Sequence, residues 1–123
     1  MLISSDTGDF ICNSLEEYRK AIRTCVDTLT DYEIWCGKGK EKYPCIGIIG
    51  NQSCSAMNYF AKEDEMYASL GDMEKEGVMD FKTKSEIYEI AAYQLIPLER
   101  MMECADEFFH KMELPTCIEW EEL

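Results

Sequence analysis

The sequence lacks any long apolar run. Its longest apolar stretches are Cys45–Ile49 and Ile90–Leu98, the second interrupted by Gln94, and a membrane span requires roughly 20 apolar residues. The first residues carry no basic stretch followed by an apolar one, so no signal peptide is expected. We therefore expect a cytoplasmic protein with no membrane partner. Its 123 residues are the length of one domain, 1–123.

Basic side chains are also scarce. Twelve Lys and Arg stand against 25 Asp and Glu, which gives a net charge of −13. Such a chain repels the phosphate backbone of nucleic acids and the anionic surface of membranes, so direct contact with either is disfavoured. The natural complement of this charge is a basic protein partner.

The sequence contains many cysteines, but their spacing is not that of a metal site. The seven are Cys12, Cys25, Cys36, Cys45, Cys54, Cys104 and Cys117. An odd number leaves at least one thiol unpaired, and no secretion signal accompanies them, so a complete disulfide framework is not expected. Zinc sites usually contain closely spaced ligand pairs, and no Cys-x-x-Cys pair occurs. We expect no metal site and predict that the thiols are small buried apolar side chains.

The residues that carry catalysis are few. The one histidine, His110, lies six residues after Cys104, so the two would point to different faces of a helix. Gly47-x-x-Gly50 is too short for a phosphate-binding loop and lacks the Lys that follows one. We therefore predict that the protein is not an enzyme and binds no cofactor. An enzyme would instead show His110 or a cysteine with converging partners in a cleft.

Two helices are predicted from capping signals and apolar spacing. Ser14 begins a Ser-x-x-Glu capping box, and apolar residues then recur every three to four positions over residues 15–29. Pro97 suits the first position of a second helix, and an apolar stripe follows over residues 98–112. Pro115 would stop that helix.

The other apolar segments have the length and alternation of strands. They are residues 10–13, 32–37, 45–49, 54–61, 66–70, 79–82 and 116–123. The fully apolar segment 45–49 is typical of a central strand covered on both faces. Residues 87–93 are ambiguous between strand and helix. The order predicts an α+β fold, with a mostly antiparallel sheet, an N-terminal and a C-terminal helix packed on it, and a short final strand.

The acidic excess lies in the second half of the chain. Residues 61–96 have a net charge of −5 and residues 97–123 of −6. Many of these acids lie in strand-connecting turns near aromatic residues, a combination typical of protein interfaces, since charge speeds encounter and aromatic burial holds the complex. The simpler alternative is that the acids keep the surface soluble. The predicted contact residues are Tyr59, Glu63, Asp64, Glu65, Tyr67, Asp72, Glu74, Glu76 and Asp80.

The C-terminal third resembles a known family. Ile96-Pro97-Leu98-Glu99 opens the second helix, Glu107-Phe108-Phe109 lies near its end, and Leu114-Pro115-Thr116-Cys117-Ile118-Glu119-Trp120-Glu121-Glu122-Leu123 follows. This ending resembles that of bacterial polymorphic-toxin immunity proteins of the first numbered family (Imm-one type). Members close with such a helix, a Pro-containing turn and a short strand with Trp two or three residues from the end. Leu114 departs from the many relatives that have a basic residue before the proline.

The resemblance implies an antitoxin, not a catalyst. Such immunity proteins serve interbacterial competition by binding and neutralising a cognate polymorphic toxin, and toxins paired with the family include nucleic-acid deaminases and nucleases. Together with the acidic composition, the resemblance leads us to expect a 1:1 heterodimer in which an acidic surface occludes the toxin's basic substrate cleft. Pro115 and Trp120 carry over as structural positions. The alternative is a small-molecule-binding or regulatory domain of unknown ligand, which would show a deep apolar pocket with few converging polar groups.

Overall fold

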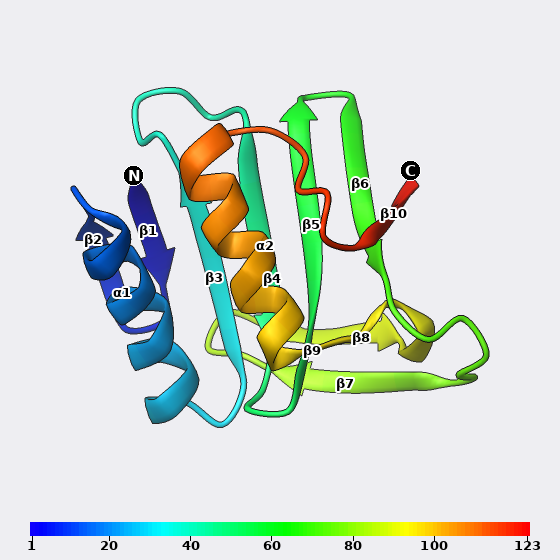
Figure 1. Cartoon of the computed structure of the whole chain (residues 1–123). Helices are drawn as coiled ribbons and strands as arrows, with labels where there is room; N and C mark the ends of the chain where they lie inside the picture. The colour runs from blue at the N-terminus through cyan, green and yellow to red at the C-terminus, as the bar shows by residue number, and fades with distance from the viewer.

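The structure combines one large sheet, two helices and a separate hairpin (Figure 1). It is a computed structural model that describes all of residues 1–123. The strands are β1 (Leu2–Ser5), β2 (Gly8–Ile11), β3 (Tyr32–Gly37), β4 (Cys45–Gly50), β5 (Cys54–Lys62), β6 (Glu65–Leu70), β7 (Val78–Lys82), β8 (Ile87–Ala91), β9 (Ile96–Pro97) and β10 (Glu119–Glu122). The helices are α1 (Leu15–Thr28), α2 (Leu98–Lys111) and a 3-10 turn at Ala92–Gln94.

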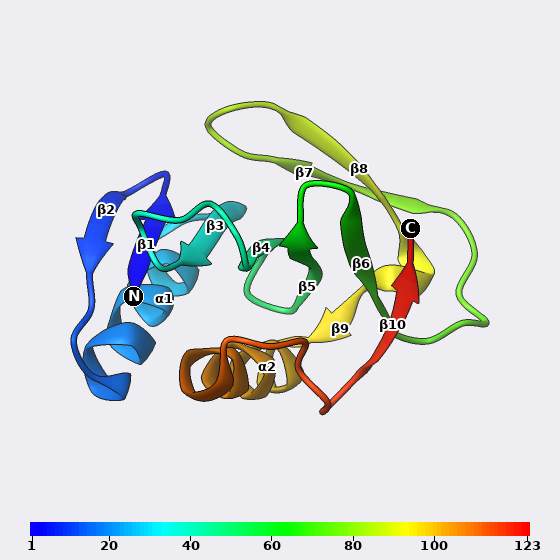
Figure 2. The same ribbon diagram turned by 90° about the horizontal axis from the view of Figure 1, so that it is seen from above.

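The large sheet has the strand order β10-β6-β5-β4-β3-β1-β2, and β9 adds a short pair with β5. All of its strand pairs are antiparallel. Both helices lie on one side of this sheet, and the β7–β8 hairpin lies on the other (Figure 2). The predicted α+β fold, with a helix near each end of the chain packed on an antiparallel sheet, is confirmed.

Helix α1 begins as the capping pattern predicts. The Ser14 hydroxyl accepts a hydrogen bond of 3.1 Å from the Glu17 amide, which supplies a partner for one free amide of the first turn. The helix then buries Tyr18, Ile22 and Val26, and the spacing of these residues places them on one face.

Helix α2 packs beside α1 across the sheet. The rings of Tyr18 and Phe109 lie 5.0 Å apart between their centroids, and Arg19 forms a 2.6 Å ion pair with Asp106 at the surface. The helix ends at Lys111, and Met112 adopts a left-handed conformation that terminates it. Pro115 therefore lies beyond the helix end.

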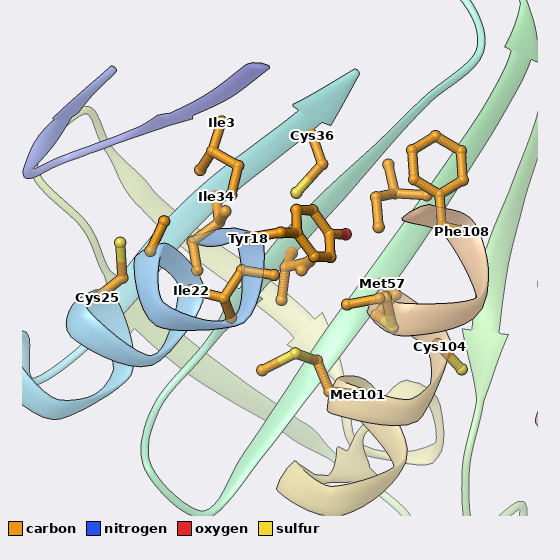
Figure 3. Close-up of a cluster of buried hydrophobic side chains, with 14 of the residues drawn as sticks. Ile3, Tyr18, Ile22, Cys25, Ile34, Cys36, Met57, Met101, Cys104 and Phe108 are labelled. Atoms are coloured by element: carbon orange, nitrogen blue, oxygen red, sulfur yellow. The ribbon is translucent and has the colours of Figure 1, made fainter. Parts of the chain in front are cut away.

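The core lies between the helices and the inner face of the sheet. Tyr18, Ile22 and Cys25 of α1 face Ile34 and Cys36 of β3 (Figure 3). Four of the seven cysteines are buried: Cys12, Cys25, Cys36 and Cys104. The prediction that the thiols are small buried apolar side chains is confirmed for these four, whereas Cys45, Cys54 and Cys117 are only half-buried.

The β7–β8 hairpin, called the arm below, crosses the outer face of the sheet. Its register pairs Phe81 with Tyr88, and Phe81 is fully buried beneath it. The Lys82 amide donates a 2.7 Å hydrogen bond to Asp31, just before β3, so the arm is tied to the sheet by backbone as well as side-chain contacts. The ambiguous segment 87–93 is resolved as strand β8 followed by the start of the 3-10 turn.

Several details differ from the sequence expectations. The final strand spans Glu119–Glu122 where residues 116–123 were expected, and the short strand β9 was not predicted. Strand β1 was not predicted, because its four residues contain only two apolar side chains and show little alternation. Strand β2 spans Gly8–Ile11 where residues 10–13 were expected, and Pro97 immediately precedes α2 where it was expected within it. Neither helix is long and apolar enough to cross a membrane.

Candidate protein-binding surfaces

The seven predicted acidic contact residues lie in two separate places. Glu63, Asp64 and Glu65, called the turn cluster, lie at the β5–β6 turn and the start of β6. The loop cluster lies beyond the other end of β6 and on the arm and consists of Asp72, Glu74, Glu76 and Asp80. A strand as long as β6 separates its two ends by roughly 20 Å. None of these seven carboxylates is in an ion pair, so their charge is available to a partner.

The two predicted aromatic contact residues lie on the inner face. Tyr59 is only 7% exposed and packs against Phe108 of α2, with 6.2 Å between ring centroids. Tyr67 is half-buried beside Tyr59, with 6.0 Å between the two ring centroids. Hydrogen bonding to Glu122 chiefly raises the pKa of Tyr67, which keeps its hydroxyl protonated. Both rings therefore belong to the core side of the sheet, where Tyr59 leaves little surface for contact and Tyr67 remains partly exposed.

Strand β10 extends the acidic surface along the edge of the sheet. Glu119, Glu121 and Glu122 are three of its four residues, and β10 pairs with the whole length of β6 except its first two residues. Asp64, Glu65 and Glu122 border one surface depression of about 250 Å³. The sequence indicated a net negative C-terminal third, but the placement of these acids beside the turn cluster depends on long-range pairing that local patterns do not reveal.

An aromatic surface that the sequence did not single out lies on the outer face. Trp35 is 38% exposed, and its ring stacks obliquely on Phe60, with 5.6 Å between centroids. Its ring also lies on the backbone of Gly47, where an added Cβ would be 2.9 Å from the ring carbons. Glycine at this position therefore lets Trp35 lie close against β4. The signal in the sequence was weak, because one Trp in an alternating strand looks like any half-buried position.

Glu33 joins the arm to Trp35. Its carboxylate accepts hydrogen bonds from Trp35 Nε1 (2.8 Å), Tyr88 Oη (2.9 Å), Ser85 Oγ (2.6 Å) and Thr83 Oγ1 (3.4 Å). Partial burial alone would raise the pKa of Glu33, but the four donors outweigh it and lower the pKa. Burial together with the bond to Glu33 raises the pKa of Tyr88 to about 12. The Glu33 carboxylate thus remains charged and fixes both the arm and the Trp35 indole.

The thiols and the histidine do not form a nucleophilic pair. Burial raises the pKa of Cys36 to about 12 and also raises that of Cys104, so both stay protonated near neutral pH, and the thiolate is the reactive form. His110 is exposed at the end of α2, with its ring edge against Phe109. No group of three or more His, Cys, Asp or Glu side chains is arranged to hold a metal ion.

Comparison with known proteins gives a family. The family model described as Immunity protein Imm1 matches residues 36–122. The matched segment runs from the end of β3 to the end of β10, so it includes the arm, both acidic clusters and helix α2. No curated protein matches the chain.

Proposed function

The chain belongs to the Imm1 family of immunity proteins, and from this premise we propose that it neutralises one cognate bacterial polymorphic toxin by binding to it. The family match is the observation that carries the proposal. Protection of a cell requires a tight complex, with a dissociation constant in the nanomolar range or below, or about −12 kcal/mol. The complex is proposed to be a 1:1 heterodimer, and the chain performs no reaction in it.

The acidic surface is the proposed means of inhibition. A toxin that acts on nucleic acid, such as a deaminase or a nuclease, binds a polyanion in a basic cleft. The turn cluster and the β10 acids offer unpaired carboxylates along one sheet edge, and the loop cluster offers more at the far end of β6. Filling the basic cleft with these carboxylates would exclude substrate by both charge and volume.

The cytoplasm is the proposed site of action. All seven cysteines are free thiols, including the half-buried Cys45, Cys54 and Cys117. Reducing compartments preserve such thiols, whereas secreted proteins usually pair them. A toxin that enters a neighbouring cell to reach its nucleic acid would meet its inhibitor there.

Co-expression tests the proposal. The toxin domain encoded by the gene adjacent to this one is expressed in a bacterial host with and without the chain, and growth is measured. The proposal predicts growth arrest by the toxin domain alone and full growth when the chain is present. The purified complex should have the mass of one toxin domain plus 14.3 kDa. Growth arrest that persists despite abundant folded chain would contradict the proposal.

A competition experiment tests the proposed occlusion of the cleft. The probe is a single-stranded oligonucleotide bound to a catalytically inactive form of the toxin domain. Addition of the chain should displace the oligonucleotide completely. A ternary complex that retains the oligonucleotide would show that inhibition acts at a distance from the substrate site.

A further inference from the structure

The strand register aligns the outer face of the sheet into rows. One row runs Ser4, Trp35, Gly47, Asn58, Ala68 and Glu121, each paired with the next across β1, β3, β4, β5, β6 and β10. The neighbouring row runs Leu2, Gly37, Cys45, Phe60 and Met66. We call these two rows the open face. Glu121 is its one charged side chain.

The arm does not extend over these rows. Its anchor Glu33 belongs to the next row, which pairs Glu33 with Ile49 and Ile49 with Ala56. Ile49 and Ala56 are buried. In the open face the small Gly47 and Ala68 are buried too, whereas the larger Trp35, Asn58 and Phe60 all retain exposed surface. Figure 2 shows the arm on the side of the sheet away from the helices. The part of the open face around Trp35, Asn58 and Phe60 is therefore outer surface that the chain leaves without a covering element.

The Trp35 side chain is fixed in one orientation on this face before any partner binds. Gly47 lies under its ring, Phe60 packs at its side, and Glu33 fixes the indole nitrogen. A side chain already held in one orientation loses little conformational entropy on binding, and Trp is enriched among residues that dominate binding energy. Beside it, Leu2, Gly37 and Cys45 line a groove of about 350 Å³, enough to accept a large side chain of a partner.

The charge of the open face differs between its β10 end and the surroundings of Trp35. On β10, Glu119 and Glu121 lie on the outer face, whereas Glu122 pairs with Tyr67 on the inner face. Beside Trp35, the loop between β3 and β4 carries Lys38, Lys40 and Lys42, with Glu41 as its one acid. Four strand spacings, roughly 19 Å, separate Trp35 from Glu121. This asymmetry favours a partner with one apolar anchor and a cationic group displaced toward β10.

We infer that the open face is the docking site of the cognate toxin domain, with Trp35 as its central apolar anchor. This inference rests on the proposed function and adds to it a specific surface. The toxin places an aromatic or long aliphatic side chain against Trp35 and the adjoining groove. It places Arg or Lys side chains over Glu121 and the β10 edge, where they meet unpaired carboxylates. The acids thus orient the complex, and the aromatic surface slows its dissociation.

The first experiment measures binding of the toxin domain encoded by the adjacent gene, using surface-immobilised toxin domain. Trp35→Ala should weaken binding about 30-fold or more, chiefly through a faster dissociation rate. Ile87→Ala is the matched control, because Ile87 is an apolar side chain 63% exposed on β8 of the arm, outside the two rows of the open face. This control should bind within threefold of the unmodified chain.

The second experiment needs no substitution at the site and so does not depend on the fold of the Trp35 variant. The chain contains two Trp residues, Trp35 and the half-buried Trp120 of β10. Labelling with 5-fluorotryptophan gives one fluorine resonance for each, and Trp120→Phe assigns them. Unlabelled toxin domain should change the chemical shift of the Trp35 fluorine. It should also abolish the difference in that shift between H2O and D2O, because the bound toxin domain would exclude solvent from the ring.

The outcomes separate the two proposals. If the unmodified chain does not bind the toxin domain, the proposed function itself fails. If it binds, but Trp35→Ala binds equally well and the Trp35 resonance does not move, the open-face site is wrong and the immunity function stands. If the Trp35 resonance moves with the concentration of the chain alone, a second copy of the chain occupies the face, which also overturns the inference.

Discussion

The two faces of the sheet are built from the same strands but have different roles. In β3, Tyr32, Ile34 and Cys36 point to the helices and are at most 1% exposed. Glu33 and Trp35, between them, point to the arm side and remain partly exposed. Because successive residues of a strand point to opposite faces, one short segment contributes to the core and to the outer surface at once. Substitutions on the inner face should therefore act on stability, and those on the outer face on binding.

The sharpest contrast is expected from Phe108 of α2, which is fully buried on the inner face. Phe108→Ala removes its packing on Tyr59 and leaves a cavity, which should lower the free energy of unfolding by about 3–5 kcal/mol. Met73→Ala is the control, because Met73 is 59% exposed and should change stability by less than about 0.5 kcal/mol. Urea unfolding measures both. Equal stability of the two variants would contradict the assignment of the core.

A substitution of Glu33 tests whether this carboxylate holds the arm against the outer face of the sheet. Glu33→Gln removes a charged acceptor from up to four donors and should lower the free energy of unfolding by about 1–3 kcal/mol. Glu89→Gln makes the same change on an exposed carboxylate of the arm and should have almost no effect. Proteolysis of native protein should reveal earlier cleavage in the arm of Glu33→Gln. An arm as resistant as that of the unmodified chain would show that Glu33 does not hold it.

The same carboxylate predicts a pH dependence. Hydrogen bonds hold the pKa of folded Glu33 below its ordinary value of 4.5, so on acidification the unfolded chain takes up this proton before the folded chain does. Its contribution to stability is present above about pH 4.5 and is lost as pH falls through the lower folded value. The stability difference between the unmodified chain and Glu33→Gln should therefore shrink as the pH falls below about 4.5. A constant difference would contradict the lowered pKa.

The smallest effect on stability, but a clear effect on association, is expected from the turn cluster. Glu63→Lys with Asp64→Lys should change stability by less than about 0.5 kcal/mol. At about 10 mM salt it should slow association with the toxin domain about tenfold, and much less at 150 mM. Glu16→Lys with Glu99→Lys matches the change in net charge at exposed positions of α1 and α2, on the opposite side of the sheet from the open face. If both pairs slow association equally, net charge and not the turn cluster is responsible.

Elements with strong local signals could be predicted from the sequence. The Ser14 cap, the apolar spacing of both helices and the uninterrupted 45–49 strand are local patterns, and the structure confirms each. Strand β1 could not be predicted in this way, because it is specified by pairing with β2 and β3 at a distance in the chain. Local patterns reveal which residues alternate but not which partners lie beside them.

The binding surface was harder to predict than the fold. The exposed acids of the turns could be identified because turns lie at the surface. The burial of Tyr59 depends on which face of β5 meets α2, and alternation alone does not decide that. Trp35 becomes noticeable only with Gly47 beneath it and Glu33 bonded to its nitrogen, and both contacts come from folding. Residues that act together across strands have no signature in a single segment.

The central claim is that the chain neutralises its toxin by stoichiometric binding. The direct measurement is a titration of toxin activity, with the toxin domain held at a concentration far above the dissociation constant and the chain added in steps. The account predicts a linear fall that reaches zero at one equivalent and does not change with incubation time. Complete inactivation by a small fraction of an equivalent, progressing with time, would show turnover and contradict it.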